Sequence, residues 1–279
     1  DPKSFDEAMF ILLCGTGVGF SVERQFIQQL PEVPELFESE TMIVVKDSKE
    51  GWAKAYRQLL ALLWAGEIPK WDVSRVRPAG ARLKTFGGRA SGPAPLVELF
   101  NFTVTTFKLA QGRKLSSMEC HDLMCFIGQI VVVGGVRRSA MISLSNLSDD
   151  RMRHAKSGQW WETAPHRALA NNSVSYTEKP DIETFMREWT ALVESKSGER
   201  GIFNREASKA QAAKYGRRDP DWQFGTNPCS EIILRPYQFC NLTEVVVRAT
   251  DSVKDLERKV KLATILGTIQ SSYTKFPYL

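Results

Sequence analysis

Two thiols and a carboxylate lie close together near the end of the sequence. The motif NPCSEI supplies Asn227, Cys229 and Glu231, and the later motif FCNLTE supplies Cys240. Side chains on extended backbone repeat every two residues, so Asn227, Cys229 and Glu231 are predicted to face one side. Cysteine can act as a thiolate or a sulfur-centred radical, glutamate can exchange a proton, and the asparagine amide donates and accepts hydrogen bonds. Cys240 could return across a hairpin as a reductant.

Two other interpretations of these cysteines remain open. Free cysteines are often buried as small hydrophobic residues. A metal site could instead combine Cys229 and Cys240 with Cys120, His121 and Cys125, although structural zinc sites favour two tightly spaced ligand pairs and this sequence has one loose pair. Cys120 and Cys125 fall in an apolar stretch, so we predict that they pack inside a helix and assign no metal ligands.

The two motifs together resemble the active-site finger loop of the ribonucleotide reductases. They are most similar to the adenosylcobalamin-dependent, monomeric ribonucleoside-triphosphate type, called class II. Further matches follow in the same order along the chain: GTGVGF at 15–20, DSKEGW at 47–52, KTFGGRASGP at 84–93, GGVRRSA at 134–140 and HRALANNSV at 166–174. Ordered blocks of this kind are a far more specific signal than any one short motif.

The resemblance implies a role for each residue of the first two motifs. Cys229 would carry the thiyl radical that removes the 3′ hydrogen of the ribose, and Glu231 would deprotonate the 3′ hydroxyl. Asn227 would hold the substrate hydroxyls, and Cys240 would be one half of the dithiol that supplies electrons. Adenosylcobalamin would start the radical chemistry, which side chains alone cannot do. We therefore expect Cys229 in a closed, dry cavity, with Glu231 beside it and Cys240 nearby.

The resemblance also implies two nucleotide-binding segments. Ser91 and Gly92 are expected near the substrate, where a hydroxyl and backbone donors meet ribose or phosphate oxygens, although a plain turn before a helix would also fit. A glycine-rich specificity loop is expected between the substrate base and a deoxynucleotide allosteric effector, although an ordinary glycine turn with solvated arginines would look the same. Its residues are Gly135, Val136, Arg137, Arg138 and Ser139.

The family fold is a ten-stranded α/β barrel with the finger loop threaded through its centre. The pattern of the sequence by itself supports only the α/β class. We interpret residues 1–279 as part of one catalytic barrel domain, with an effector-binding insertion around 35–84. The family's upstream thiol partner of Cys240 and its C-terminal thiol pair have no counterpart in this sequence. The resemblance therefore predicts a chain that is truncated at both ends and inactive alone.

Apolar spacing and capping residues predict the elements that must position these side chains. Residues 15–19 are expected to form a tight glycine loop, and 67–95 a long irregular connection. Asp181 is expected to cap the helix that follows it. The predicted helices are 5–13, 51–65, 96–111, 117–129, 181–196 and 254–270, the predicted strands are 172–177 and 244–248, and 130–133 is either a buried strand or a helix end.

The composition of the chain indicates which ligands and which cell compartment suit it. The chain has 279 residues, 43% of them hydrophobic, and a net charge of +5, which suits polyphosphate substrates. The basic residues are dispersed, so direct nucleic-acid binding is not indicated. No run of eighteen apolar residues and no basic start before an apolar region is seen, so we expect neither membrane insertion nor secretion, and five cysteines suit a reducing compartment. We expect a cytoplasmic protein.

Three functions are therefore compared. The first is a reductase that converts ribonucleoside triphosphates to deoxyribonucleotides with adenosylcobalamin and a thioredoxin-like reductant, and so supplies DNA precursors. The second is a class I ribonucleoside-diphosphate reductase large subunit, whose radical comes from a partner subunit. The third is a non-enzymatic module that binds nucleotides or is held together by a metal.

Overall fold

The central feature of the fold is a four-stranded parallel sheet. The computed structural model describes residues 1–83, 88–133, 139–275 and 278. The strands follow the order β1 (Gly17–Ser21), β4 (Ala140–Asn146), β5 (Ala170–Tyr176) and β6 (Gly201–Asn204), and every neighbouring pair is parallel. Parallel neighbours require crossover connections, which this chain makes through helices. The predicted α/β class is confirmed, and these four strands form part of a barrel wall.

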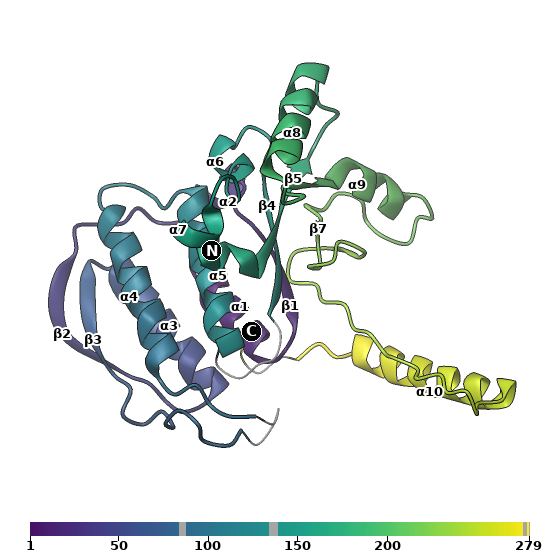
Figure 1. Ribbon diagram of the computed structural model, residues 1–279, viewed down its shortest axis with the longest axis horizontal. Helices are drawn as coiled ribbons and strands as arrows, with labels where there is room; N and C mark the ends of the chain where they lie inside the picture. Colours follow the sequence, from purple (N-terminus) through teal and green to yellow (C-terminus); the bar gives the residue numbers. More distant parts are fainter. Residues whose placement is uncertain (84–87, 134–138, 276–277, 279) are drawn as a thin grey trace.

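A layer of long helices covers one face of this sheet and contains most of the core. Figure 1 shows α1 and α5 next to the sheet, then α3 and α4, and then a parallel pair of strands on the outside. This pair is β2 (Phe37–Val44) and β3 (Glu67–Asp72). The long helices of the layer are α1 (Ser4–Leu13), α3 (Lys49–Trp64), α4 (Ala94–Leu109) and α5 (Ser117–Val133).

The remaining elements are short, apart from two helices. An antiparallel pair, β7 (Gly225–Thr226) and β8 (Ile233–Leu234), forms a hairpin beside β1. The other helices are α2 (Arg24–Ile27), α6 (Asp150–Arg153), α7 (Trp160–Thr163), the 3-10 helix η1 (Pro165–Leu169), α8 (Ile182–Ser195), α9 (Arg205–Ala213) and α10 (Val253–Ser271).

Local sequence explains where the helices begin. The Ser48 hydroxyl accepts a hydrogen bond from the Gly51 amide at 2.9 Å and caps α3. The carboxylate of Asp181 accepts one from the Thr184 amide at 2.8 Å, so the predicted cap of α8 is confirmed. Ser252 and the third residue of α10 satisfy each other's backbone amides in a capping box.

Three local predictions are wrong. The connection predicted for residues 67–95 contains β3, whose outer pairing with β2 overrides the weak strand pattern around Pro69. Most of the glycine loop predicted at 15–19 belongs to β1, because pairing with β4 extends its backbone. The strand predicted at 244–248 has no regular structure, because those residues run beside α10 without a strand partner (Figure 1).

The last long helix lies apart from this core. In Figure 1, α10 and the segment before it extend away from the sheet. No residue of α10 is buried, although several of its side chains are large and apolar. None of the helices among residues 1–83, 88–133 and 139–275 is long and apolar enough to cross a membrane.

Candidate active site

The hairpin formed by β7 and β8 presents the first chemical motif on a tight turn. Thr226 pairs with Ile233, and the residues between them leave the strand geometry. The Asn227 side-chain carbonyl accepts a hydrogen bond from the Ile232 amide at 3.1 Å, which closes the turn. Ser230 adopts a left-handed conformation with φ of 65°. The predicted extended alternation of Asn227, Cys229 and Glu231 is therefore wrong, because the turn bends the backbone between them.

Two glycines of β1 form the seat of this hairpin. A β-carbon at Gly19 would lie 2.0 Å from the Thr226 carbonyl oxygen, and one at Gly17 would lie 2.6 Å from Pro228 Cγ. Both distances are far below van der Waals contact, so only glycine permits the hairpin to come this close to the strand. The glycine block at 15–20 therefore explains how the cysteine turn is placed.

The neighbouring strands complete the seat. The Asn171 side-chain amide, on β5, donates a hydrogen bond to the Pro228 carbonyl oxygen at 3.0 Å. The β-carbon position of Gly17 also lies 3.2 Å from the carbonyl oxygen of Ala140, the first residue of β4. Gly17, Ala140 and Asn171 all stand at the beginnings of parallel strands. The turn therefore lies at the edge of the sheet where the three strands start.

A buried ion pair fixes the base of the hairpin. Both guanidinium Nη atoms of Arg205 donate to the carboxylate of Glu23, at 2.8 and 2.7 Å, and Arg205 Nε donates to the Phe224 carbonyl oxygen at 2.8 Å. Both charged side chains are almost completely buried. Burial alone would raise the pKa of Glu23, but the hydrogen bonds and charge of Arg205 outweigh it and lower that pKa. This tie links the end of β1, the start of α9 and the residue before β7.

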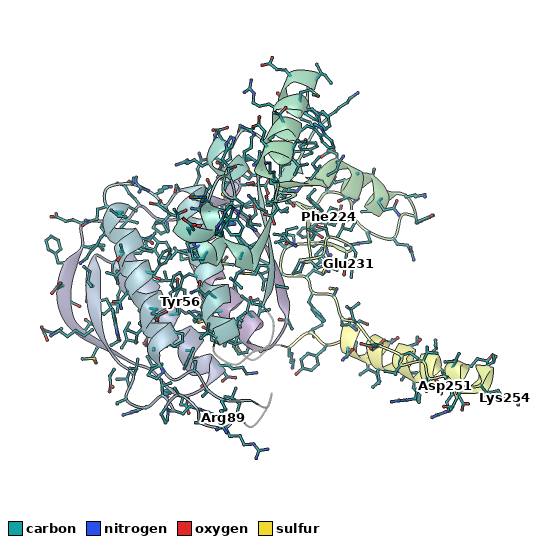
Figure 2. All side chains as sticks on the ribbon, in the orientation of Figure 1. Tyr56, Arg89, Phe224, Glu231, Asp251 and Lys254 are labelled. Carbon is teal, nitrogen blue, oxygen red and sulfur yellow. The ribbon has the colours of Figure 1, made fainter. Side chains whose placement is uncertain are left out.

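The expected closed cavity around Cys229 is not found in the described part of the chain. Cys229 and Glu231 are both exposed, and Asn227 is half-buried. Figure 2 shows Glu231 near Phe224 and apart from the helical layer that contains Tyr56. The expectation is wrong here because the described sheet covers the turn from one side only.

Cys240 lies beside a different element. The neighbouring Asn241 donates its side-chain amide to the Gly267 carbonyl oxygen of α10 at 3.0 Å. The predicted return of Cys240 across a hairpin toward Cys229 is not observed, because the hairpin ends at Leu234 and the chain then follows α10 (Figure 1). Of the four residues given chemical roles, the structure groups Asn227, Cys229 and Glu231 on one turn, whereas Cys240 follows the hairpin and precedes Asn241, which is bonded to α10.

The other predicted nucleotide contacts lie in separate places. Ser91 donates its hydroxyl to the Gly92 carbonyl oxygen at 2.9 Å, just before α4, and none of the hydrogen bonds between described residues joins this turn to the hairpin. In the specificity loop, Gly135, Val136, Arg137 and Arg138 lie outside the described residues. Ser139 follows them, and its buried hydroxyl has no hydrogen-bond partner among the described side chains and backbone.

The cysteines of the metal hypothesis do not converge. Cys120 and Cys125 are buried in α5, as predicted, and His121 lies within 3.6 Å of the Cys125 sulfur. Burial raises the pKa of Cys120 to about 12, so it packs as a neutral thiol. Among residues 1–83, 88–133 and 139–275, no group of three or more possible metal-ligating side chains is present.

Sequence reasoning missed several residues that hold the hairpin. Asn171 fell in a block that resembles a strand lining the site, but sequence reasoning assigned it no specific role, and its hydrogen bond to Pro228 appears only in the structure. Glu23 and Arg205 are 182 residues apart, and neither carries a local signal. Only the folded chain brings them together.

A family model supports the resemblance in the first half of the chain. Residues 23–106 match the model described as "B12-dependent ribonucleotide reductase, insertion domain". This stretch contains β2, β3, α3 and most of α4, the outer layers of the fold. It overlaps the insertion that we expected around 35–84.

Curated relatives and a solved structure extend the resemblance along the chain. An adenosylcobalamin-dependent ribonucleoside-triphosphate reductase of Lacticaseibacillus paracasei is 32% identical over 86% of this chain and 37% of its own length. That of Lactobacillus gasseri is 30% identical over 90% of this chain and 39% of its own length. A crystal structure titled as a B-12 dependent (class II) ribonucleotide reductase aligns with a TM-score of 0.72 and 28% identity, over 85% of this chain and 37% of that one.

The resemblance to the adenosylcobalamin-dependent ribonucleotide reductases is thus confirmed in both sequence and fold. The chain spans about 37% of the length of the curated relatives that it matches.

Proposed function

We propose that this chain supplies the radical-bearing turn and the adjoining strands of a reductase that converts ribonucleoside triphosphates to 2′-deoxyribonucleoside triphosphates. One observation carries the proposal: matched blocks far apart in sequence meet at one place. The glycines of β1, the start of β4 after the specificity loop, and Asn171 of β5 all surround the NPCSEI turn. The names of the relatives support the triphosphate substrate and favour this function over a class I subunit.

The complete reaction is proposed for a full-length reductase that contains this sequence. Cys229 and Glu231 are exposed in the chain described here, whereas a radical site must exclude water. The seat fixes where the turn lies relative to the strand starts. Closure over the turn is a separate requirement of the full-length enzyme.

The turn fits adenosylcobalamin chemistry because its thiol is accessible. The Cys229 thiol stands exposed on a turn that the sheet supports from behind, so a radical initiator has access to it. When bound, the cofactor supplies the one-electron chemistry that side chains lack.

The side chains of the turn then divide the work. Cys229, as a thiyl radical, takes the 3′ hydrogen atom of the ribose, while Glu231 accepts the proton of the 3′ hydroxyl. Asn227 already uses its carbonyl oxygen to close the turn, which leaves its NH2 group to donate to a substrate hydroxyl. Cys240 and a second thiol give up two electrons and two protons and form a disulfide, while the 2′ hydroxyl leaves as water and a hydrogen takes its place. Cys229 then returns the hydrogen atom to the 3′ carbon and becomes a thiyl radical again.

Regulation and partners are inferred from the same resemblance. We assign a deoxynucleotide effector to the insertion at 35–84 and to the specificity loop, and the substrate to Ser91 and Gly92 as well as to the turn. A thioredoxin-like protein would return the disulfide to thiols. The five free cysteines support a cytoplasmic location.

The test is a substitution at the radical position in the full-length reductase. Cys229→Ser should abolish both deoxynucleotide formation and exchange of the ribose 3′ hydrogen, because a hydroxyl group does not form the required sulfur radical. The matched control is Cys14→Ser, at the end of α1, which should retain activity. Turnover by Cys229→Ser at the control's rate would refute the proposal, and activity without added cobalamin would favour the class I alternative.

A further inference from the structure

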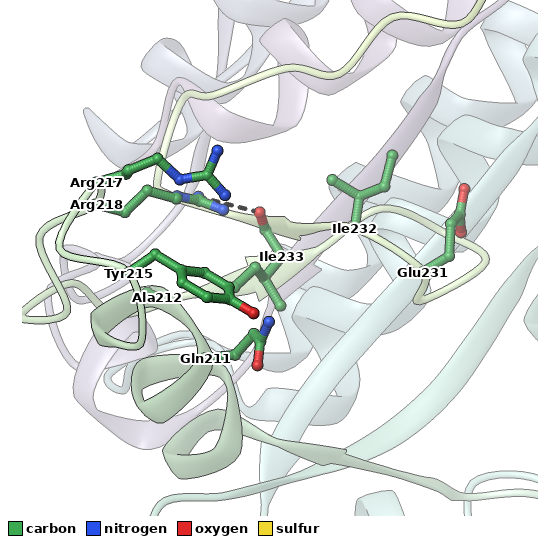
Figure 3. A pocket seen from close by; sticks show the side chains of 8 residues that line it. All are labelled: Gln211, Ala212, Tyr215, Arg217, Arg218, Glu231, Ile232 and Ile233. Carbon is green, nitrogen blue, oxygen red and sulfur yellow. Dashed lines mark hydrogen bonds between the residues drawn. The ribbon is translucent and has the colours of Figure 1, made fainter.

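Two adjoining hollows lie behind the hairpin, on the side of α9. One has a volume of about 470 Å³ and the other about 430 Å³, and both are lined by Arg217 and Arg218. Figure 3 shows Arg217, Arg218 and Tyr215 gathered around the first hollow, with Ile233 of β8 facing them and Glu231 at the far end of the turn. Arg235 lines the second hollow.

Each arginine lies against an aromatic ring. The guanidinium carbon of Arg217 is 5.6 Å from the ring centre of Tyr215, and that of Arg218 is 5.4 Å from Phe224. Arg235 lies 5.6 Å from Trp222. Contact with an aromatic face orients the planar guanidinium while its N–H edge stays free to donate.

These three charges have no acidic partner in the described part of the chain. None of the ion pairs between described residues includes Arg217, Arg218 or Arg235. Asp219 lines the second hollow, but one of its oxygens already accepts the Asp221 amide at 2.8 Å. Lys214 adds a further cation over the Tyr215 ring. Glu231 also lines the first hollow, so the three arginines outnumber the two carboxylates of the lining, Asp219 and Glu231, by one. The two hollows therefore keep a small excess of positive charge and unused N–H donors.

The hairpin itself holds one of these arginines. Arg218 Nη2 donates to the Ile233 carbonyl oxygen at 3.3 Å and to Gln238 Oε1 at 3.4 Å. A ligand on Arg218 would therefore act on β8, which continues directly from the Cys229 turn. Positive charge alone would be an ordinary solvated surface, but here the arginines converge on hollows and are oriented by rings.

We propose that the arginine hollows, defined by Arg217, Arg218 and Arg235, bind an oligophosphate group. Forked guanidinium donors match phosphate oxygens, and hollows of this size are in the range of small-molecule sites. Two adjoining hollows with shared arginines suit a chain of linked phosphates better than a single phosphate. The bound group would join the loop after α9 to the hairpin and hold the turn in one position.

The experiment is an isothermal calorimetric titration of this chain with inorganic tripolyphosphate, which measures the dissociation constant. The double variant Arg217→Gln/Arg235→Gln should bind at least about tenfold more weakly, since each charge-assisted hydrogen bond contributes strongly to binding. Arg151→Gln, at an exposed arginine of α6, is the matched control and should bind as the parent does. Equal affinity of the double variant and the control, or no saturable binding by the parent, would overturn the proposal.

Hydrogen exchange provides a second readout that a general loss of charge would not change. Tripolyphosphate should slow amide exchange in residues 225–234 of the parent and not in those of the double variant. Unchanged exchange at the hairpin in the presence of saturating ligand would refute the coupling to the turn. Thermal unfolding of each variant checks that the fold survives.

Further titrations identify the source of the phosphates. Equal affinity for a nucleoside triphosphate and for tripolyphosphate would assign the site to the phosphates alone, whereas tighter binding of the nucleotide would add a contact to the nucleoside. The same nucleoside without phosphates should not bind. If it bound as tightly as the nucleoside triphosphate, the proposal would be overturned. None of these measurements uses the Cys229 reaction, so their failure is distinguishable from failure of the proposed reductase.

Discussion

Two glycines of β1, Gly17 and Gly19, determine where the cysteine turn lies, because neither has a side chain that would push the turn away. At Gly19 the nearest obstacle to a β-carbon is a backbone carbonyl oxygen, which cannot rotate out of the way. At Gly17 it is the ring of Pro228, whose position is fixed in turn by the hydrogen bond from Asn171. Neither neighbour is the flexible end of a long side chain, so the strand cannot accept a larger residue without moving the hairpin.

Gly19→Ala tests this seat. We expect the substitution to displace the hairpin and to lower the free energy of unfolding by about 1–3 kcal/mol, as for other overpacked sites. Gly225→Ala is the control, because its β-carbon would meet only Leu144, at 3.9 Å. That change should stay within about 1 kcal/mol of the parent. Urea unfolding measures both values, and equal stability of the two variants would contradict the seat.

In a full-length reductase, Gly19→Ala should also lower the rate of turnover, because it displaces the hairpin. Since Gly19 contacts the backbone of Thr226 and no reacting group, its effect on turnover must pass through the position of Cys229.

Between elements, the Glu23–Arg205 pair holds α9 and the hairpin base to the end of β1. A buried pair of this kind is costly to break, because one charge then remains buried without its partner. Arg205→Met should therefore lower the free energy of unfolding at pH 7 by about 3–5 kcal/mol. The exposed pair Arg187–Glu183 is the matched control, and Arg187→Met should change stability by less than about 1 kcal/mol.

The same pair predicts a dependence on acid. The pKa of Glu23 is lower in the folded protein than its usual value of 4.5, so its ionised form stabilises the fold above that value. This contribution should decline as pH falls below 4.5 and be lost once the folded protein also binds the proton. Glu23→Gln should lack this part of the acid sensitivity. Urea unfolding between pH 3 and 7 measures it, and identical slopes for the parent and Glu23→Gln would refute the assignment.

The elements also show what a sequence can and cannot predict. Helices such as α3 and α8 carry apolar spacing and a capping residue, so their existence and starts follow from local chemistry. The β3 strand carries Pro69 and Lys70 and was missed, because its pairing with β2 is a tertiary effect. The motifs predicted that Asn227, Cys229 and Glu231 share one loop but not that the loop is a tight turn. The glycine seat and the Glu23–Arg205 ion pair depend on residues brought together only by folding.

At the scale of the whole molecule, α10 stands outside the cooperative core. It is 19 residues long and none of them is buried, so its stability comes from its capping box and from internal hydrogen bonds. Its amides should exchange with solvent at least on the order of a hundredfold faster than those of α5, which is buried among α1, α4 and β4. Hydrogen exchange with mass spectrometry checks this, and equal protection of the two helices in this chain would contradict it.

The strand order has a consequence for how the chain is made. β1 pairs with β4, so residues 17–21 cannot join the sheet until residues 140–146 have been synthesised. A ribosome will have released the glycines of β1 long before their partner exists, and closing so long a loop is slow. The intervening helices α3, α4 and α5 have local contacts and can assemble first. The hairpin seat should thus form after the helices that lie between β1 and β4, and the Cys229 thiol should meet its support only once those helices have assembled.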